Sequence, residues 1–164
     1  MGGRAVIFAL GVDDTRRLLA AAGDDGAVMS LIEEIEERWD RDGLVDLDKS
    51  WDALHRCLTD GELAFENGDY PLSHAILGGQ VLYDGDDYIV SYVSPEQVHD
   101  IARALAPLDE QWLRGRFATL PFGDYEGAGS EQDIAYTWAS LPGLKDFYRA
   151  AAARGRTAVF TVDQ

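Results

Sequence analysis

Residues 80–105 read QVLYDGDDYIVSYVSPEQVHDIARAL, and this stretch decides the class of fold. Gln80–Tyr83 and Tyr88–Val93 are rich in β-branched and aromatic residues, which favour strands. The Asp84-Gly85 pair between them is typical of a tight hairpin turn. The stretch therefore predicts two antiparallel strands joined directly to each other.

A helix is predicted immediately after the hairpin. Ser94 and Gln97 have the spacing of a capping box, and Pro95 stands at the first helical position, where proline is tolerated. Val98 and Ile101 then begin an apolar face with helical spacing. The fold therefore mixes antiparallel strands with helices.

Outward from this stretch, both chain ends read as strands, Ala5–Leu10 and Thr157–Val162. Further helices are expected from Asp13 or Asp14 to Gly23, over Val28–Trp39, Asp48–Thr59 and Asp109–Leu120, around Ile134 up to Pro142, and over Leu144–Ala151. We find no linker and no repeat. The sequence predicts one α+β domain over residues 1–164, with a small mixed or antiparallel sheet packed with about five to seven helices.

The composition excludes several classes of function. The chain has 30 acidic residues against 14 Lys and Arg, a formal charge of −16. That charge repels phosphate backbones and anionic lipid surfaces, so we expect neither nucleic-acid nor membrane binding. The longest stretch without a charged side chain, Tyr70–Tyr83, has 14 residues and is too short to span a bilayer. One cysteine, Cys57, and an N-terminus unlike a signal peptide indicate a cytoplasmic protein.

The negative charge is concentrated in one segment. Between Asp24 and Asp69 there are 15 acidic residues and four basic ones, a net charge of −11. Such a surface would attract a basic protein and accelerate its encounter. The simpler alternative is that the charge only keeps the protein soluble.

The most distinctive string is Leu47–His55, which reads LDKSWDALH. It resembles the Asp-Lys-x-Trp-Asp-x-Leu-His signature of the YfbM-like family of uncharacterised bacterial proteins. Residues 71–79 (PLSHAILGG) and the chain from Phe147 to Val159 are similar to later parts of that family, whereas Tyr125 is followed by Glu-Gly where the family has Tyr-Pro before an aromatic residue. The resemblance implies an α+β fold and a cytosolic bacterial setting. It supplies no reaction, although immunity-type roles in toxin systems have been proposed for such small acidic proteins.

The signature admits a chemical and a structural interpretation. On a helix, one stripe would contain Asp48, Trp51, Asp52 and His55. The carboxylates could then raise the basicity of the imidazole, so that it acts as a general base. Alternatively, the carboxylates and the imidazole could help to hold a divalent metal ion. In the structural interpretation, Asp48 caps the helix, Asp52 pairs with Arg56, and His55 bonds to a backbone carbonyl.

Two residues outside the signature complete the candidate pocket. His74 lies in the apolar run after Pro71, and Tyr125 lies in the glycine-rich loop over residues 121–130. His99 is expected in solvent. With one cysteine and no His-x-x-x-His pattern, we expect no metal site, and no glycine-rich phosphate loop indicates a cofactor.

Two functions remain open from the sequence. The favoured hypothesis is an acidic protein-binding module, immunity-like, that engages a basic partner. The alternative is a small-molecule-binding or hydrolytic domain with a pocket around Asp48, Trp51 and His55. An enzymatic activity is the less favoured interpretation, and the signature would otherwise serve only to hold the fold together.

Overall fold

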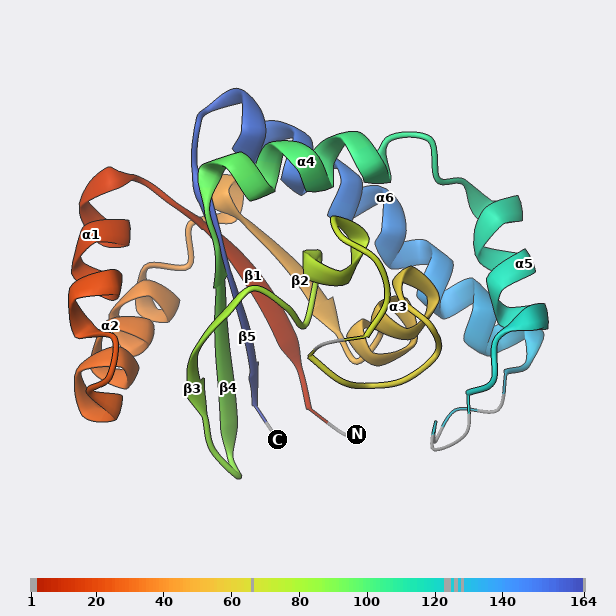
Figure 1. Cartoon of the computed structure of the whole chain (residues 1–164), viewed down its shortest axis with the longest axis horizontal. Helices are drawn as coiled ribbons and strands as arrows, with labels where there is room; N and C mark the ends of the chain where they lie inside the picture. The colour runs from red at the N-terminus through yellow and green to blue at the C-terminus, as the bar shows by residue number, and fades with distance from the viewer. Residues whose placement is uncertain (1–2, 66, 123–124, 126, 128, 164) are drawn as a thin grey trace.

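Five strands of the described chain form one open antiparallel sheet (Figure 1). The computed structural model describes residues 3–65, 67–122, 125, 127 and 129–163. The strands are β1 (Ala5–Leu10), β2 (Leu44–Asp48), β3 (Gln80–Asp84), β4 (Tyr88–Val93) and β5 (Thr157–Asp163), in the order β2-β1-β5-β4-β3. Both ends of the chain therefore contribute central strands, and β1 pairs with β5 along its whole length.

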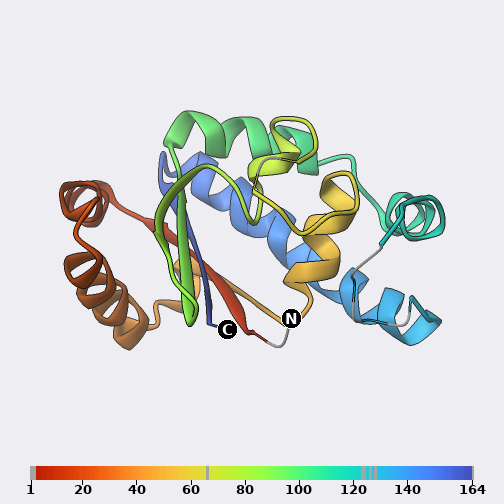
Figure 2. The same ribbon diagram turned by 60° about the horizontal axis from the view of Figure 1, so that its bottom comes forward.

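Helices cover both faces of the sheet (Figure 2). They are α1 (Val12–Ala21), α2 (Asp25–Arg38), α3 (Trp51–Leu58), α4 (Pro95–Leu105), α5 (Glu110–Thr119) and α6 (Glu131–Ala153), with single 3-10 turns at Arg41–Gly43 and Leu72–His74. The α1–α2 pair covers one face. On the opposite face α3, α4 and α6 pack on the sheet, and α5 packs outside them against α3 and α6.

The strand pattern explains why both faces need cover. In β1, Ile7 points into the core beneath α3, α4 and α6, whereas Val6 and Phe8 point into a second core beneath α1 and α2. In β5, Phe160 and Val159 divide between the same two cores. Strands that are apolar on both sides must be buried on both sides, so the sheet forms the middle layer of three.

The region from β3 to α4 is as the sequence predicts. The amide of Gly85 donates to the carbonyl of Tyr88 at 2.9 Å and closes the hairpin. The Ser94 hydroxyl accepts from the Gln97 amide at 3.3 Å, and the Gln97 side chain accepts from the Ser94 amide at 2.9 Å. The capping box is therefore complete, and the predicted α+β fold with an antiparallel sheet is confirmed.

The predicted helix start at Asp48 is wrong, because residues 44–48 form a strand that the sequence analysis missed. Asp48 pairs with Ala5 at the end of the β1–β2 ladder and has a left-handed φ of 48°. The N-cap position of α3 belongs to Ser50. With two aspartates and no apolar run, β2 has little strand signal of its own and forms by completing the edge of the sheet.

Two other helix boundaries also differ from the prediction. The residue that caps α1 is Gly11. Asp13 and Asp14 lie in the first turn, where their negative charges stabilise the helix by interacting with the positive end of its dipole. The two segments predicted on either side of Pro142 are one continuous helix, α6. Buried Leu141 and Leu144 hold the helix on the core across the proline.

Candidate functional site

The signature helix α3 is buried along its whole length. All eight of its residues are inaccessible or nearly so. Trp51 is 1% exposed, its indole nitrogen donates to the carbonyl of Gly3 at 2.9 Å, and its ring lies 5.7 Å from that of Phe160. The structure therefore places Trp51 in the core of the domain.

His55 connects two loops from inside the protein. Its side chain is fully buried, with Nε2 2.9 Å from the carbonyl of Ala64 and Nδ1 3.4 Å from the amide of Leu77. The carbonyl can only accept and the amide can only donate, so the imidazole is neutral with its proton on Nε2. Burial lowers the pKa of His55, which keeps the ring neutral.

Asp52 and Arg56 form a buried ion pair, as the structural interpretation of the signature expects. Arg56 Nε lies 2.6 Å from Asp52 Oδ1, and a guanidinium nitrogen donates to the carbonyl of Gly61 at 3.2 Å. The ring of Tyr125 lies 5.5 Å from the guanidinium carbon, a cation–π distance. Tyr125 donates its hydroxyl to the carboxylate of Asp133 at 2.8 Å, and burial raises its pKa, with Asp133 adding to the rise.

Asp48 lies apart from His55, on the edge of the sheet. Its backbone amide donates to Asp46 at 2.9 Å, and its exposed carboxylate accepts from the Tyr136 hydroxyl at 3.2 Å. None of these contacts involves a residue that bonds to His55. The structure therefore does not bring Asp48, Trp51 and His55 together on one accessible surface.

His74 lies at the wall of a hollow of about 440 Å³ beside β3. Its Nδ1 is 3.0 Å from the Ser73 hydroxyl, and its ring stands edge-on to Tyr70 at 5.0 Å. The Tyr70 hydroxyl donates to the carboxylate of Asp100 at 2.7 Å. Burial raises the pKa of Tyr70 to about 12, and the hydrogen bond to Asp100 and the charge of Asp100 contribute to the rise. Both His55 contacts lie in the loops around this hollow, so the buried histidine helps to shape it.

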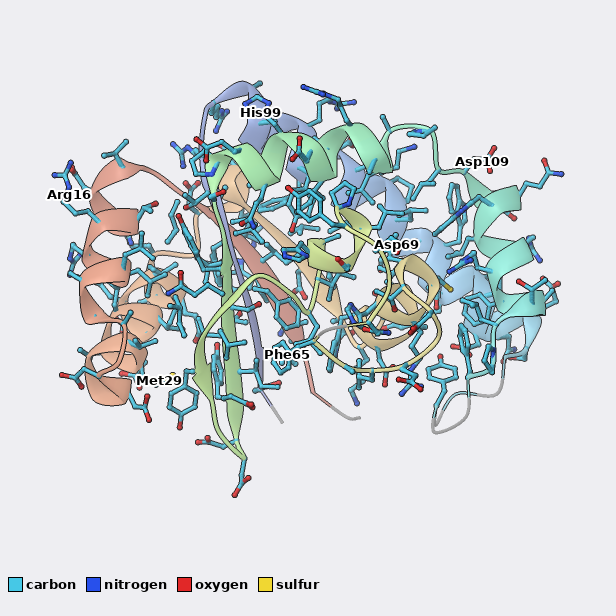
Figure 3. The ribbon with its side chains drawn as sticks, in the orientation of Figure 1. Arg16, Met29, Phe65, Asp69, His99 and Asp109 are labelled. Carbon is cyan, nitrogen blue, oxygen red and sulfur yellow. The ribbon has the colours of Figure 1, made fainter. Side chains whose placement is uncertain are left out.

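Asn67 adds a polar group to the same hollow. Its side-chain amide nitrogen, which has two hydrogens to donate, lies 2.6 to 2.9 Å from three acceptors: the Thr59 hydroxyl, the Asp60 carboxylate and the Glu62 carbonyl. Three acceptors around the nitrogen fix which way the amide points. The buried Oδ1 has no hydrogen-bond partner of normal geometry among the described residues. Figure 3 shows the loop after α3 that carries these groups, with Phe65 and Asp69 labelled on it.

The described part of the chain shows neither a cluster of metal-ligating side chains nor an accessible thiol. No group of three or more His, Cys, Asp or Glu side chains lies close enough there to hold a metal ion. Cys57 is buried, and that burial raises the pKa of its thiol to about 12, so the reactive thiolate is disfavoured. None of the described helices is both long and apolar enough to cross a membrane.

The net charge of the chain comes entirely from its middle. Residues 24–102 hold 20 of the 30 acidic residues and four of the 14 Lys and Arg, a net charge of −16. The remaining residues hold ten of each sign and are neutral together. The charged segment extends beyond the one recognised from sequence, because no Lys or Arg occurs between Arg56 and Arg103.

Part of this charge gathers where the β3–β4 hairpin meets the start of α2. Asp84, Asp86 and Asp87 are exposed at the hairpin tip, and Asp25 is exposed in the first turn of α2. The charge of Asp87, which accepts a hydrogen bond from the Tyr83 hydroxyl at 3.4 Å, raises the pKa of Tyr83, and the charges of Asp25 and Asp86 add to the rise. We call Asp25, Asp84, Asp86 and Asp87 the hairpin acidic surface. None of these four carboxylates has an ion-pair partner within the residues that the structure describes.

The protein is thus a three-layer α+β domain with a buried signature helix and an acidic hairpin end. Residues 1–161 match the family described as a domain of unknown function, DUF1877, and the chain belongs to that family. Among solved structures, it is similar to YfbM from Escherichia coli, a protein of unknown function. The two chains are 24% identical over 97% of this chain and 99% of that one, with a TM-score of 0.72, which shows a shared fold. No match was found among curated proteins.

Proposed function

We propose that this domain is a protein-binding module that engages a basic partner through the hairpin acidic surface. The observation that carries the proposal is the set of exposed carboxylates at the hairpin tip, Asp84, Asp86 and Asp87, which have no ion-pair partner in the described chain. Charges arranged in this way increase the rate of encounter with an oppositely charged partner and orient it. An immunity-like role, in which the module covers a basic protein, is one use of such a surface.

The position of the surface in the fold supports binding. The hairpin tip extends beyond the helices at the lower edge of the view in Figure 1. Tyr88 fixes the hairpin to α2 by donating its hydroxyl to the carboxylate of Glu36. The carboxylates therefore stand on a supported strand pair, which costs less ordering entropy on binding than a loose loop would.

A lysine-rich peptide of about twelve residues is a suitable probe of charge-guided binding. We expect amide NMR shifts to concentrate at residues 83–87 and around Asp25, and the affinity to fall steeply between low and physiological salt. Equal shifts at acidic residues all over the molecule would contradict a defined surface. An affinity that does not change with salt would contradict the electrostatic basis.

A second candidate function is small-molecule binding at the hollow beside His74. The observation that favours it is the buried Oδ1 of Asn67, which faces His55 without a hydrogen bond of normal geometry, in the wall of a hollow that also exposes Tyr70 and Val81. A ligand with a hydrogen-bond donor and an apolar body would satisfy both groups. A fragment screen by NMR tests this: hits should shift Asn67 and His74 together, and no hit at either residue would reject the site.

A further inference from the structure

A groove of about 480 Å³ lies between α4 and α6, away from the hairpin end of the molecule (Figure 1). Figure 3 marks its rim with His99, on the outer side of α4. Its α4 wall carries His99, Ala102, Arg103 and Ala106, which follow the i, i+3, i+4, i+7 spacing of one helix face. This size is within the usual range for small-molecule sites.

The floor of the groove is apolar and contains an aromatic ring. Trp138 packs against the main core but remains partly exposed, and the small side chains of Ala102 and Ala106 leave the space above it open. Pro142 lies one helical turn beyond Trp138 and lacks the amide hydrogen that would bond to the Trp138 carbonyl. Together these residues give a planar ring an apolar surface to pack on.

The rim of the groove is cationic, although the chain as a whole is strongly acidic. Lys145 donates to the carbonyl of Leu108 at 2.7 Å, which holds its ammonium group at one end of the groove. Arg149 is 78% exposed and pairs with Asp146 at 2.8 Å. Arg103 is exposed, and the described residues form no ion pair with it. One carboxylate thus stands against three permanent cations.

We propose that this groove binds a small organic anion with a planar aromatic body, such as an aryl carboxylate or an aryl phosphate. The ring lies over Trp138 between the two alanines and Pro142, and the anionic group is held by Arg103 and Lys145. Guanidinium and ammonium groups bind carboxylate and phosphate by charge-assisted hydrogen bonds. This site is on a different part of the molecule from the hairpin acidic surface and does not depend on the function proposed above.

Three ligands that share a naphthalene ring test the proposal. 2-Naphthoate and 2-naphthyl phosphate should both shift the indole N–H resonance of Trp138, assigned with a Trp138→Phe variant, and their relative affinities decide between carboxylate and phosphate. 2-Naphthylmethylammonium has the same ring with a positive charge and should bind at least about tenfold more weakly, because it faces three cations. Equal binding of all three ligands would overturn the anion specificity.

Variants then locate the binding site. Arg103→Gln should weaken binding of the anions about five- to tenfold, and Ala106→Leu should abolish it by filling the groove. Arg154→Gln is the matched control: it removes an exposed cation at the C-terminal end of α6, outside the groove, and should change the dissociation constant less than about twofold. Each variant replaces an exposed side chain, so we expect the variants to fold like the wild type. Thermal melting checks this expectation. No Trp138 shift at millimolar ligand, or equal effects of the Arg103 and Arg154 variants, would overturn the proposal.

Discussion

The signature helix α3 and the tip of the β3–β4 hairpin use their charged residues in opposite ways. In α3, Asp52 and Arg56 are buried and paired with each other, and His55 bonds to the backbone of two loops. At the hairpin tip, Asp84, Asp86 and Asp87 are exposed. The most distinctive sequence of the chain therefore builds the scaffold, whereas a plain acidic turn presents the groups available to a partner.

This difference gives a rule for the effect of substitutions. Changes in α3 should alter the free energy of unfolding, because buried charges and hydrogen bonds are costly to break. Changes at the hairpin tip should leave stability nearly constant and alter binding, because exposed charges contribute little to folding. The following predictions test the two halves of that rule.

The largest effect is expected at the buried ion pair. Arg56→Met should lower the free energy of unfolding by about 3–5 kcal/mol, because it leaves the buried Asp52 carboxylate without the guanidinium. The double variant Asp52→Leu/Arg56→Met should recover part of that loss, because no buried charge remains. Urea unfolding measures both. A single variant as stable as the wild type would show that the pair does not support α3.

The next largest effect is expected at His55. His55→Ala leaves the Ala64 carbonyl and the Leu77 amide without their partner inside the protein, which should cost about 3 kcal/mol by the same unfolding measurement.

The pH dependence of stability gives an independent test of the neutral His55. Burial lowers its pKa in the folded state below the ordinary value of 6.5, so below that pH the unfolded chain binds a proton that the folded chain does not. The stabilisation is complete above about pH 6.5 and is lost as the pH falls. His55→Gln should therefore lose less stability between pH 7 and pH 5 than the wild type, and urea unfolding at the two pH values measures the difference.

A smaller effect is expected at Asp48, where two structural roles make different predictions. Serine caps helices about as well as aspartate, so a capping role would make Asp48→Ser neutral. The left-handed φ of 48° predicts instead that Asp48→Ser costs about 1 kcal/mol, while Asp48→Asn and Asp48→Gly are tolerated. Equal stability of the Ser and Asn variants would contradict the backbone explanation.

The smallest effect on stability is expected at the hairpin. Replacing Asp84, Asp86 and Asp87 together by asparagine should change the free energy of unfolding by less than about 0.5 kcal/mol. The pKa of Tyr83 should fall back towards its ordinary value of 10, because Asp87 and Asp86 raise it in the wild type. Titration of the Tyr83 ring carbon by NMR measures the fall, and an unchanged pKa would show that the carboxylates do not act together.

The sequence predicts the parts of this fold that rest on local signals. The Asp84-Gly85 turn, the Ser94–Gln97 capping box and the apolar stripe from Val28 to Ile35 are all found where their patterns place them. The strand β2 has no such local signal, because its pairing with β1 is a contact between distant residues. Asp48 was misplaced for that reason.

The candidate site was less predictable than the fold. The i, i+4 spacing of Asp52 and Arg56 on a helix predicts an ion pair, and the structure contains that ion pair. The sequence does not show that His55 is enclosed by two loops, or that Tyr125 stacks on Arg56, since both contacts come from tertiary packing. Counting charges along the chain could have extended the acidic segment to the hairpin, because no Lys or Arg occurs between Arg56 and Arg103.

The most direct test of the central claim compares two variants of equal net charge. One replaces Asp84, Asp86 and Asp87 by asparagine; the other carries Asp109→Asn, Glu131→Gln and Asp146→Asn, at exposed carboxylates outside the acidic middle of the chain. Both have a formal charge of −13 in place of −16. The measurement is the dissociation constant for the lysine-rich peptide at low salt. We predict that the hairpin variant binds about tenfold more weakly than the wild type and the other variant less than about threefold more weakly. Equal weakening in both variants would show that only the total charge matters and would contradict the account.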